Sequence, residues 1–551
     1  MPGEAGSFAV ADYLVFGGML VLSAAIGAYN GWTSRNQSGS GHFLTGSRKL
    51  TALPVSTSLI TTFMTSVTLL TNPVEVYNYG GIFGLLCFSY TVAIFISSEI
   101  FMPFFYRLGF TSIYEYLELR FNRTIRLLGI LLFMVNIIVL NGLIIYAPAL
   151  ALNQGAGVDL WGGIISTAVV CTIYCTLGGM KAVVWTCVLQ IGVMLAGNLS
   201  VIIKAVMLQG GISTVLSDAQ EGGRMNFWDA MYINLLGLMC IMLCSVFAGF
   251  CLYSVYKNCD PFTAGLVSAS DQMMPYLVMD IMKGYPGLPG LYFAGVYSGT
   301  LSTVSCTINC LTAVTLVDLI KPYTTLSAKH LSILSKGLSL FYGVLFIGMA
   351  GLASLMGGMM EAVVILSGIT QGPMFGVFTL GVLCPFVNSK GVVSGLVSGV
   401  LASLCACLWA LFSPPTPEMT RPLPLTTAGC NFTTSPNWTS TAPPTQPTLF
   451  ATTVSHNSSD IHQLAEGWPS ISYLYFGMVG TLACLIMGMI VSLLTGGWNE
   501  TVDPKLTFMK EDTLTYQLYK FLKDNITRKR SKHGQKNVTR TEFCLNTISG
   551  T

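Results

Sequence analysis

The sequence predicts an all-α protein that crosses a membrane many times. Apolar residues make up 52% of the 551-residue chain, charged residues make up only 9%, and the mean hydropathy is +0.65. Soluble globular domains typically contain about 25% charged residues. The apolar residues also gather in uninterrupted stretches of about 20, which is the length of a helix that spans a bilayer.

We find twelve such stretches along the chain. Backbone groups inside lipid must be hydrogen-bonded internally, and stretches this long favour helices over the shorter strands of a membrane barrel. No basic segment precedes the first stretch, so we expect it to be a retained anchor rather than a cleaved signal peptide. The stretches are 8–30, 52–78, 82–106, 127–150, 158–177, 183–207, 231–254, 289–316, 334–356, 361–383, 392–413 and 471–495.

Basic residues predict which ends of the stretches face the cytoplasm. Lysines and arginines follow the first, third, fifth and eighth stretches and are abundant in the C-terminal tail, and such loops are cytoplasmic in membrane proteins. We therefore expect residues 1–497 to form a membrane domain and residues 498–551 a basic cytoplasmic tail.

The longest loop of the membrane domain, residues 414–470, is predicted to be extracellular. It is rich in Pro, Thr and Ser and contains three acceptor sequences for N-glycosylation, at Asn431, Asn437 and Asn457. Two cysteines also lie in polar loops, Cys259 and Cys430. They could pair in an extracellular disulfide or remain free thiols, and the sequence leaves both possibilities open.

These topological assignments conflict at one place. A cytoplasmic first loop puts the N-terminus outside, and twelve spans would return the C-terminus to the outside, where the basic tail does not belong. The loops on both sides of the stretch 231–254 have extracellular character. Either this helix is inverted or re-entrant, or a span that should precede it is absent.

A run of hydroxyl side chains is the strongest indication of function. Residues 298–309 read SGTLSTVSCTIN and lie within an uncharged apolar stretch. Polar side chains at membrane depth are costly unless they face a protein interior or a cavity, so they predict an ion or substrate path. The alternative is structural: Ser and Thr in a membrane helix often bond to carbonyls of their own helix or join neighbouring helices.

Several longer motifs resemble the sodium/solute symporter family. They include TSIYEYLELRFN at 111–122, IYAPALALNQ at 145–154, TLGGMKA at 176–182, PGLPGL at 286–291 and the hydroxyl run itself. Within that family the chain looks most similar to the branch of sodium-coupled monocarboxylate, iodide and multivitamin transporters, and most of all to the monocarboxylate members.

The resemblance implies a fold of two inverted five-helix repeats with Na⁺ and a small organic anion bound beside broken helices. Transporters of this branch have thirteen spans, whereas about twelve helices are predicted here. The family pattern has a broken core helix, the first of the second repeat, where this chain continues directly from Asp229 to Tyr232. The resemblance and the charge pattern thus identify the same junction.

The resemblance also implies a sodium site. Thr61 and Met64 match positions that offer backbone carbonyls, Gly299 matches another carbonyl position, and Ser302 and Thr303 match side-chain oxygen ligands. Oxygen ligands suit a hard cation. The last three residues have the spacing i, i+3 and i+4, which puts them on one face of a helix.

Two positions depart from the family pattern at this site. Cys187 stands where the family has an aspartate near the sodium, and Cys306 stands where relatives carry a hydroxyl. A carboxylate that would neutralise a bound cation is therefore lost.

Substrate-binding residues are implied at three further positions, Thr68, Gln190 and Asn309. Threonine at position 68 matches the monocarboxylate transporters rather than the iodide or multivitamin transporters. The sequence Thr71-Asn-Pro73 shortly after it suits a break in the helix, which would direct free backbone groups at a small anion.

The leading interpretation is a plasma-membrane protein that couples Na⁺ to the uptake of small monocarboxylates such as lactate or short-chain fatty acids. The alternatives are a transport-deficient relative that acts as an assembly partner or has no function, symport of iodide or a vitamin anion, and an ion channel. The partners expected are Na⁺, an organic anion and the lipid bilayer. No phosphate-binding loop or catalytic constellation is present, so we expect no enzymatic activity, no cofactor besides Na⁺ and no nucleic-acid partner. The oligomeric state is left open.

Overall fold

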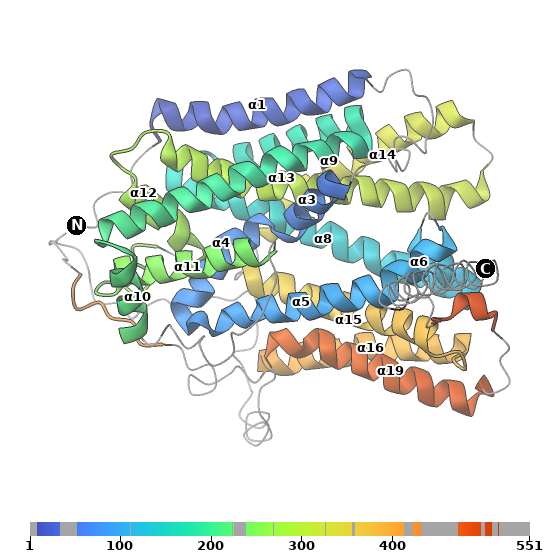
Figure 1. Cartoon of the computed structure of the whole chain (residues 1–551). Helices are drawn as coiled ribbons and strands as arrows, with labels where there is room; N and C mark the ends of the chain where they lie inside the picture. The colour runs from blue at the N-terminus through green and yellow to red at the C-terminus, as the bar shows by residue number, and fades with distance from the viewer. Residues whose placement is uncertain are drawn as a thin grey trace, which may run out of the picture.

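Helices form an elongated bundle in this protein (Figure 1). The computed structural model describes residues 8–33, 52–110, 112–222, 224, 238–267, 269–324, 327–354, 359–412, 423–430, 472–497, 502–509 and 516, and these residues contain no strand. The predicted all-α class is therefore confirmed for the described part of the chain. Of the predicted outer loop and basic tail, only residues 423–430, 502–509 and 516 are described, and Asn431, Asn437 and Asn457 lie outside the described residues.

The α-helices run mostly along the long axis of the bundle, with α13 and α9 near α1 and with α16 and α19 on the opposite side (Figure 1). Their bounds are α1 Val10–Thr33, α3 Ala52–Phe63, α4 Ser66–Tyr79, α5 Leu86–Ile96, α6 Met102–Leu108, α7 Ile113–Arg120, α8 Arg123–Ala156, α9 Leu160–Leu208, α10 Ile212–Glu221, α11 Leu238–Tyr256, α12 Met273–Ile281, α13 Leu288–Val314, α14 Ala328–Ala353, α15 Met359–Leu383, α16 Ser389–Phe412 and α19 Phe476–Leu494.

Most of the twelve predicted stretches correspond to helices that could cross a membrane. By length and composition, nine helices within the described residues qualify, and two predicted stretches match shorter apolar helices, Leu160–Thr176 and Met242–Tyr256. The remaining stretch, 52–78, is divided into α3 and α4. The nine are Val10–Asn30, Gly81–Leu108, Arg123–Asn153, Gly179–Leu208, Leu288–Tyr323, His330–Ala353, Glu361–Leu383, Ser389–Ala410 and Tyr473–Leu494.

A glycine separates the two halves of α9. Gly179 has φ 57° and ψ −155°, a conformation outside the helical region that side chains disfavour. The Gly-Gly pair at 178–179 therefore lets the chain change direction between two apolar segments, which the sequence predicted as separate stretches.

The break between α3 and α4 lies at Met64 and Thr65. Thr65 has extended backbone angles, and its side chain accepts a hydrogen bond from the amide of Thr68, which makes it the N-cap of α4. The predicted break at Thr71-Asn-Pro73 is wrong, because Pro73 lies inside α4. A proline removes only one backbone donor, and α4 continues past it to Tyr79.

One end of the bundle gathers basic segments from distant parts of the chain. Arg107 donates to the carbonyls of Lys505 and Thr507, and the guanidinium of Arg123 lies 4.6 Å from the ring centroid of Tyr323. The end of α6 therefore lies beside the segment 502–509, and the start of α8 lies beside the segment that follows α13. This grouping agrees with the cytoplasmic side that the charge pattern predicted.

The opposite end is held by the segment 423–430. A disulfide joins Cys259 to Cys430, one of the two states that the sequence left open. The amide of Leu423 donates to the carbonyl of Asn78 at the end of α4, and the buried guanidinium of Arg224 donates to the carbonyl of Pro424.

Helix α11, at the junction of the topological conflict, ends on this same side. Its Tyr253 ring lies 3.8 Å from the guanidinium of Arg224, and Lys257 pairs with Asp218 of α10. Its other end is deep in the bundle, where Met242 packs in one cluster with Met64, Leu69 and Met194. Arg224, just before the undescribed segment 225–237, thus lies at the same end of the bundle as the C-terminal end of α11, and α11 runs outward from the interior to that end.

Candidate ion and substrate site

The gap between α3 and α4 is filled by α13, the helix that carries the hydroxyl run. A Cβ atom at Gly299 would lie 3.0 Å from the carbonyl oxygen of Met64 and 3.0 Å from the amide nitrogen of Ser66. Only a glycine lets the two backbones come this close. The structure therefore brings three of the predicted sodium positions together, since Thr61, buried in the last turn of α3, directly precedes the gap.

The backbone at the gap offers groups of both polarities. The last carbonyls of α3 and the first amides of α4 have no partners within their own helices. The carbonyl ends suit a cation and the amide ends suit an anion.

The predicted side-chain ligands of α13 lie next to this gap. Thr303 is buried, and its hydroxyl donates to the carbonyls of Thr62 (3.3 Å) and Gly299 (3.0 Å). Ser302 is buried too, with its Oγ atom 3.5 Å from the Sγ atom of Cys187 on α9. Helices α3, α9 and α13 thus meet at these two residues.

Several other hydroxyls of the run form hydrogen bonds within their own helix or to a neighbouring helix, which is the structural alternative to an ion path. Ser305 and Thr307 donate to carbonyls of their own helix, and Thr307 also donates to the Oδ1 atom of Asn141 on α8. Thr300 donates to the carbonyl of Ile144. The run therefore combines helix-to-helix bonds with a smaller group of oxygens at the α3–α4 gap.

Gln190 on α9 is buried without a hydrogen bond from either amide atom to another described residue. The Ser298 hydroxyl of α13 is buried and unpaired in the same way. Buried amides and hydroxyls normally have partners, so such groups indicate a place for a bound ligand or water.

Contacts between α9 and α13 bracket these two unpaired groups. Met194 contacts Gly295 on one side of them, and Cys187 contacts Ser302 on the other. Gln190 therefore lies at about the level of Gly299 along the two helices.

The three predicted substrate residues do not form one cluster. Thr68 is in the first turn of α4, where its hydroxyl donates to the carbonyl of Thr65. Asn309 is ten residues beyond Gly299 on α13, about 15 Å along the axis at 1.5 Å per residue. Asn309 is buried with both amide atoms unpaired among the described residues, so it belongs to a different level of the bundle.

Helix α8 also contributes to the site, which the sequence did not predict. The carbonyl of Ile144 accepts from Ser66 at the start of α4 and from Thr300 of α13, and Asn141 one turn earlier accepts from Thr307. An asparagine within an apolar stretch was the available signal for Asn141, whereas the role of a backbone carbonyl leaves no trace in sequence.

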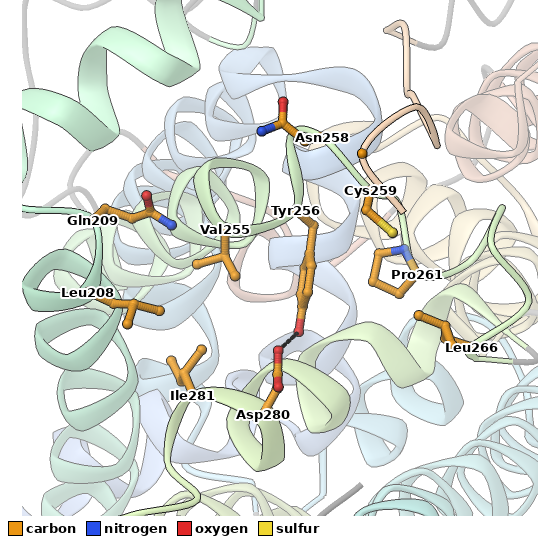
Figure 2. Close-up of a pocket in the computed structure, with 11 residues that line it drawn as sticks. Leu208, Gln209, Val255, Tyr256, Asn258, Cys259, Pro261, Leu266, Asp280 and Ile281 are labelled. Carbon is orange, nitrogen blue, oxygen red and sulfur yellow. Dashed lines mark hydrogen bonds between the residues drawn. The ribbon is translucent and has the colours of Figure 1, made fainter. Parts of the chain in front are cut away.

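A cavity of about 430 Å³ lies at the disulfide end of the bundle, away from the α3–α4 gap. Figure 2 shows the side chains that line it, with the hydroxyl of Tyr256 donating to the carboxylate of Asp280 at 3.1 Å. Cys259 and Gly429 also line it. It is therefore an outer cavity beside the disulfide, separate from the predicted ion site.

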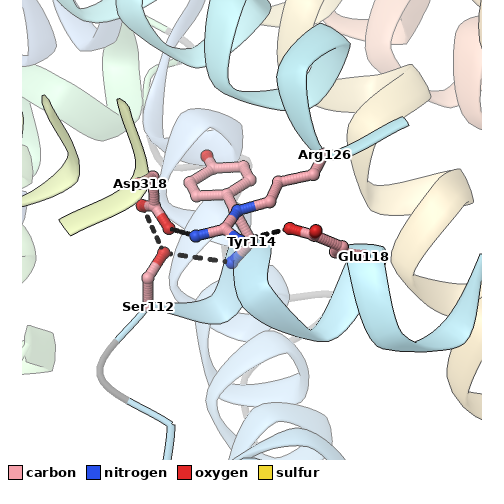
Figure 3. Close-up of polar contacts among 5 residues, drawn as sticks. All are labelled: Ser112, Tyr114, Glu118, Arg126 and Asp318. Atoms are coloured by element: carbon pink, nitrogen blue, oxygen red, sulfur yellow. Dashed lines mark hydrogen bonds and ion pairs between the residues drawn. The ribbon is translucent and has the colours of Figure 1, made fainter. Parts of the chain in front are cut away.

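At the basic end, Arg126 joins three segments through ion pairs and hydrogen bonds (Figure 3). The Arg126 guanidinium lies between the carboxylates of Glu118 in α7 and Asp318 in the turn that directly follows α13, and Ser112 donates to Asp318 at 2.7 Å. The Asp318 side chain is fully buried. This network ties the hydroxyl-rich helix to the motif at 111–122.

Comparison with known proteins agrees with this architecture. Residues 43–231 match the family model described as the sodium:solute symporter family. The chain is 49% identical to sodium-coupled monocarboxylate transporter 1 of Xenopus laevis, over 93% of this chain and 90% of that protein. The chain belongs to the sodium:solute symporter family. As a member of that family it is a multi-pass membrane protein and not an enzyme.

Two other relatives define its place within the family. The human sodium-coupled monocarboxylate transporter 1 is 48% identical over 93% of this chain and 92% of that protein. The human sodium/iodide cotransporter is 39% identical over 90% of this chain and 85% of that protein. The greater similarity to monocarboxylate transporters agrees with the resemblance found from the motifs.

A solved symporter structure has the same fold. A sodium-coupled sialic acid symporter in a substrate-bound, outward-open state superposes with a TM-score of 0.66 over 89% of this chain and 98% of that chain, at 19% sequence identity. At that identity the likeness concerns the fold, which is all-helical and polytopic in both proteins.

Proposed function

We propose that this chain is built to couple Na⁺ to the symport of small monocarboxylate anions, such as lactate or short-chain fatty acids, across the plasma membrane. The observation that supports this most is the contact of Gly299 with the backbone of Met64, which gathers carbonyl and hydroxyl oxygens from α3 and α13 at one point. The names of the most similar relatives supply the ion and the class of substrate.

In this proposal Na⁺ binds at the carbonyls of Thr61, Met64 and Gly299 and at the hydroxyls of Ser302 and Thr303. A bound cation would hold α3 and α13 in register and lower the cost of placing an anion at the amide end of α4. Movement of one charge through a membrane potential of 100 mV supplies about 2.3 kcal/mol, which can drive the anion inward.

Substrate selection would depend on groups near the start of α4. Thr68 follows the gap closely in sequence, and the unpaired amide of Gln190 lies at about the level of Gly299 along the helices. We propose that both contact the carboxylate of the substrate. Asn309 would act at a different point along the path. Symport of iodide or a vitamin anion is the competing specificity, and the sodium/iodide cotransporter is more distant from this chain.

A second proposal is that the chain is a transport-deficient member of the family. The alignment with the Xenopus relative is 560 positions long, whereas 93% of 551 residues is about 512, so some 48 aligned positions have no residue from this chain. A membrane helix needs about 20 residues, so a shortfall of this size is long enough to include one.

The direction of α11 supports the loss of a span. Arg224 and the end of α11 lie at the same end of the bundle, so the chain between them makes no net crossing. We propose that the inverted-repeat fold lacks the first, broken helix of its second repeat between Asp229 and Tyr232, which lie outside the described residues. Cys187 in place of the family aspartate removes a further contribution to the cation site.

Uptake of labelled lactate distinguishes the two proposals. Cells expressing this chain are compared in Na⁺ and choline media with cells expressing a version that carries the corresponding segment of the Xenopus relative between Asp229 and Tyr232, with surface biotinylation to correct for delivery. Uptake by the unaltered chain supports transport and excludes the deficient variant. Uptake by the repaired chain alone supports the deficient variant.

A matched pair of variants tests whether the proposed ion site is responsible for Na⁺-dependent uptake. In whichever chain transports lactate, Ser302→Ala should abolish Na⁺-dependent uptake, while Ser394→Ala on α16, whose hydroxyl donates to the carbonyl of Gly391 in its own helix, should leave it unchanged. Equal uptake by the Ser302 variant would contradict the proposed ion site. Competition with unlabelled iodide tests the alternative specificity.

The same cells test the remaining proposals about placement. Surface biotinylation reports delivery to the plasma membrane, and a mobility shift after glycosidase treatment reports glycans at Asn431, Asn437 or Asn457. A glycosylated loop within 414–470 would fix that part of the membrane domain outside and the tail 498–551 inside.

A further inference from the structure

The outer cavity beside the disulfide combines one charged side chain with mostly apolar walls (Figure 2). It lies where the ends of α9, α11 and α12 meet the segment that carries Gly429. Its volume of about 430 Å³ is within the usual range of pockets that hold small molecules. The apolar part of the wall consists of Leu208, Val255, Pro261, Leu266 and Ile281.

Asp280 is the charged residue among those that line the cavity. Its Oδ2 atom accepts the hydrogen bond from Tyr256 at 3.1 Å. Within the described residues the carboxylate has no second hydrogen bond and no ion pair, so its Oδ1 atom is free to accept another donor. A half-buried carboxylate without a cation is costly, and a positively charged ligand would lower that cost.

Two lysines on the same elements are engaged elsewhere. Lys257, next to Tyr256, pairs with Asp218 of α10. Lys204, one turn before the end of α9, lies 3.9 Å from the ring centroid of Tyr285. Neither lysine therefore neutralises the carboxylate in the cavity.

The ring of Tyr256 adds a second group that attracts a cation. It is buried, lines the cavity and packs against Tyr276 with ring centroids 5.9 Å apart, so its position beside Asp280 is fixed. Aromatic rings attract ammonium groups, and an ionised carboxylate accepts strong hydrogen bonds from N–H donors. An anion would instead be repelled by Asp280, so the cavity does not suit a second monocarboxylate.

We propose that this cavity binds a small protonated amine with an apolar body. The ammonium group would donate to the free oxygen of Asp280 beside the Tyr256 ring, and the body would lie against the apolar wall. Leu208, Asn258 and Leu266 line the cavity and are exposed, so a ligand can enter from the surface of the described part of the chain.

This proposal does not depend on transport. The cavity is separate from the α3–α4 gap, and an amine can bind there whether or not lactate is carried. Its test therefore measures binding rather than uptake.

The test uses the full chain in phosphatidylcholine nanodiscs, with protein-free nanodiscs as the blank. Calorimetric titration with 2-phenylethylammonium should show one saturable site. Two probes divide the ligand into its parts: 2-phenylethanol has the same body without the charge, and ethanolamine has the ammonium group without the body. Each should bind about tenfold or more weakly, because it loses either the charged hydrogen bond or the buried apolar area.

Two variants locate the binding site. Asp280→Asn should weaken binding of 2-phenylethylammonium by about tenfold or more, since a hydrogen bond to a neutral group is weaker. Asp159→Asn is the matched control: it removes a carboxylate outside the cavity lining, keeps an oxygen for the amide of Gly162, and should bind as the unaltered chain does. Leu208→Trp, at an exposed position, should weaken binding by filling the cavity while Asp280 stays intact.

Several results would overturn the proposal. They are the absence of a saturable site in the unaltered chain, equal affinity for 2-phenylethylammonium and either comparison probe, and unchanged binding in Asp280→Asn or in Leu208→Trp. A loss in Asp159→Asn as large as in Asp280→Asn would overturn it too. The comparison of probes uses the unaltered chain alone, so it decides the question even where a variant fails to fold.

Discussion

Gly299 of α13 touches the carbonyl oxygen of Met64 so closely that a Cβ atom at position 299 would lie only 3.0 Å from it. The same Cβ atom would lie 3.0 Å from the amide of Ser66, which is backbone and cannot rotate away. The helix break and the glycine therefore depend on each other, and the position of the oxygens at the gap depends on both.

Replacing this glycine should disturb the gap directly. We expect Gly299→Ala to destabilise the protein by about 1–3 kcal/mol, the usual cost of overpacking a filled interior. Thermal unfolding in detergent checks this. Gly192→Ala on α9 is the control, because a Cβ atom there would meet nothing within 4 Å. If both variants unfold at the same temperature, the close contact is not structurally important.

The cap of α4 gives a second prediction. Thr65→Ala removes the side-chain acceptor for the Thr68 amide and should cost about 1 kcal/mol. Thr65→Ser keeps the oxygen and should restore most of the melting temperature. Thr379→Ala on α15 is the control, since that hydroxyl donates to the carbonyl of Phe375 in its own helix at an exposed position. Equal effects of Thr65→Ala and Thr65→Ser would argue against the cap.

The thiol at position 187 gives a third prediction, about the affinity for Na⁺. Cys187→Asp puts a carboxylate beside Ser302, where it would be costly without a counterion and favourable with one. The melting temperature of this variant should rise as Na⁺ replaces choline, by more than that of the unaltered chain, because ligand binding stabilises the folded state. Cys187→Asn has a similar shape and no charge, and it should show no gain. The same Na⁺ response in both variants would contradict a cation at this position.

The charged network around Arg126 gives a fourth prediction. Asp318→Asn leaves Arg126 with Glu118 as its one charged partner in Figure 3, and removing one member of a buried pair costs about 3–5 kcal/mol. Arg126→Gln alone should also destabilise the protein, by leaving the buried Asp318 carboxylate without its cation. The double variant should lose less than the sum of the single losses, since residues in contact are not additive. Strict additivity of the unfolding free energies would show that the two residues act independently.

The sequence alone determined the class of the fold and the family. Long apolar stretches require helices because backbone groups in lipid must bond within their own segment, and this holds whatever the neighbours are. The motifs around 111–122, 176–182 and 298–309 identified the family, and the relatives confirm it. The charge pattern located the topological conflict at 231–254, a stretch within which the structure describes α11 from Leu238 onward.

Local sequence signals mispredicted the position of the helix break, because that position depends on the contact between two backbone segments. Pro73 suggested a break, but a proline costs one hydrogen bond, and α4 accommodates it. The actual break at Met64 and Thr65 has no proline or glycine. It forms where Thr65 can cap α4 and where Gly299, 234 positions later, leaves room for the backbone.

The tertiary structure alone decided which side chains share the site. Helical spacing put Gly299, Ser302 and Thr303 on one face, but only the packing of α3, α9 and α13 brings that face to Met64 and Cys187. The same packing separates Asn309 from Thr68. Contacts between residues more than a hundred positions apart depend on the mutual fit of whole helices, and a one-dimensional pattern contains no record of that fit.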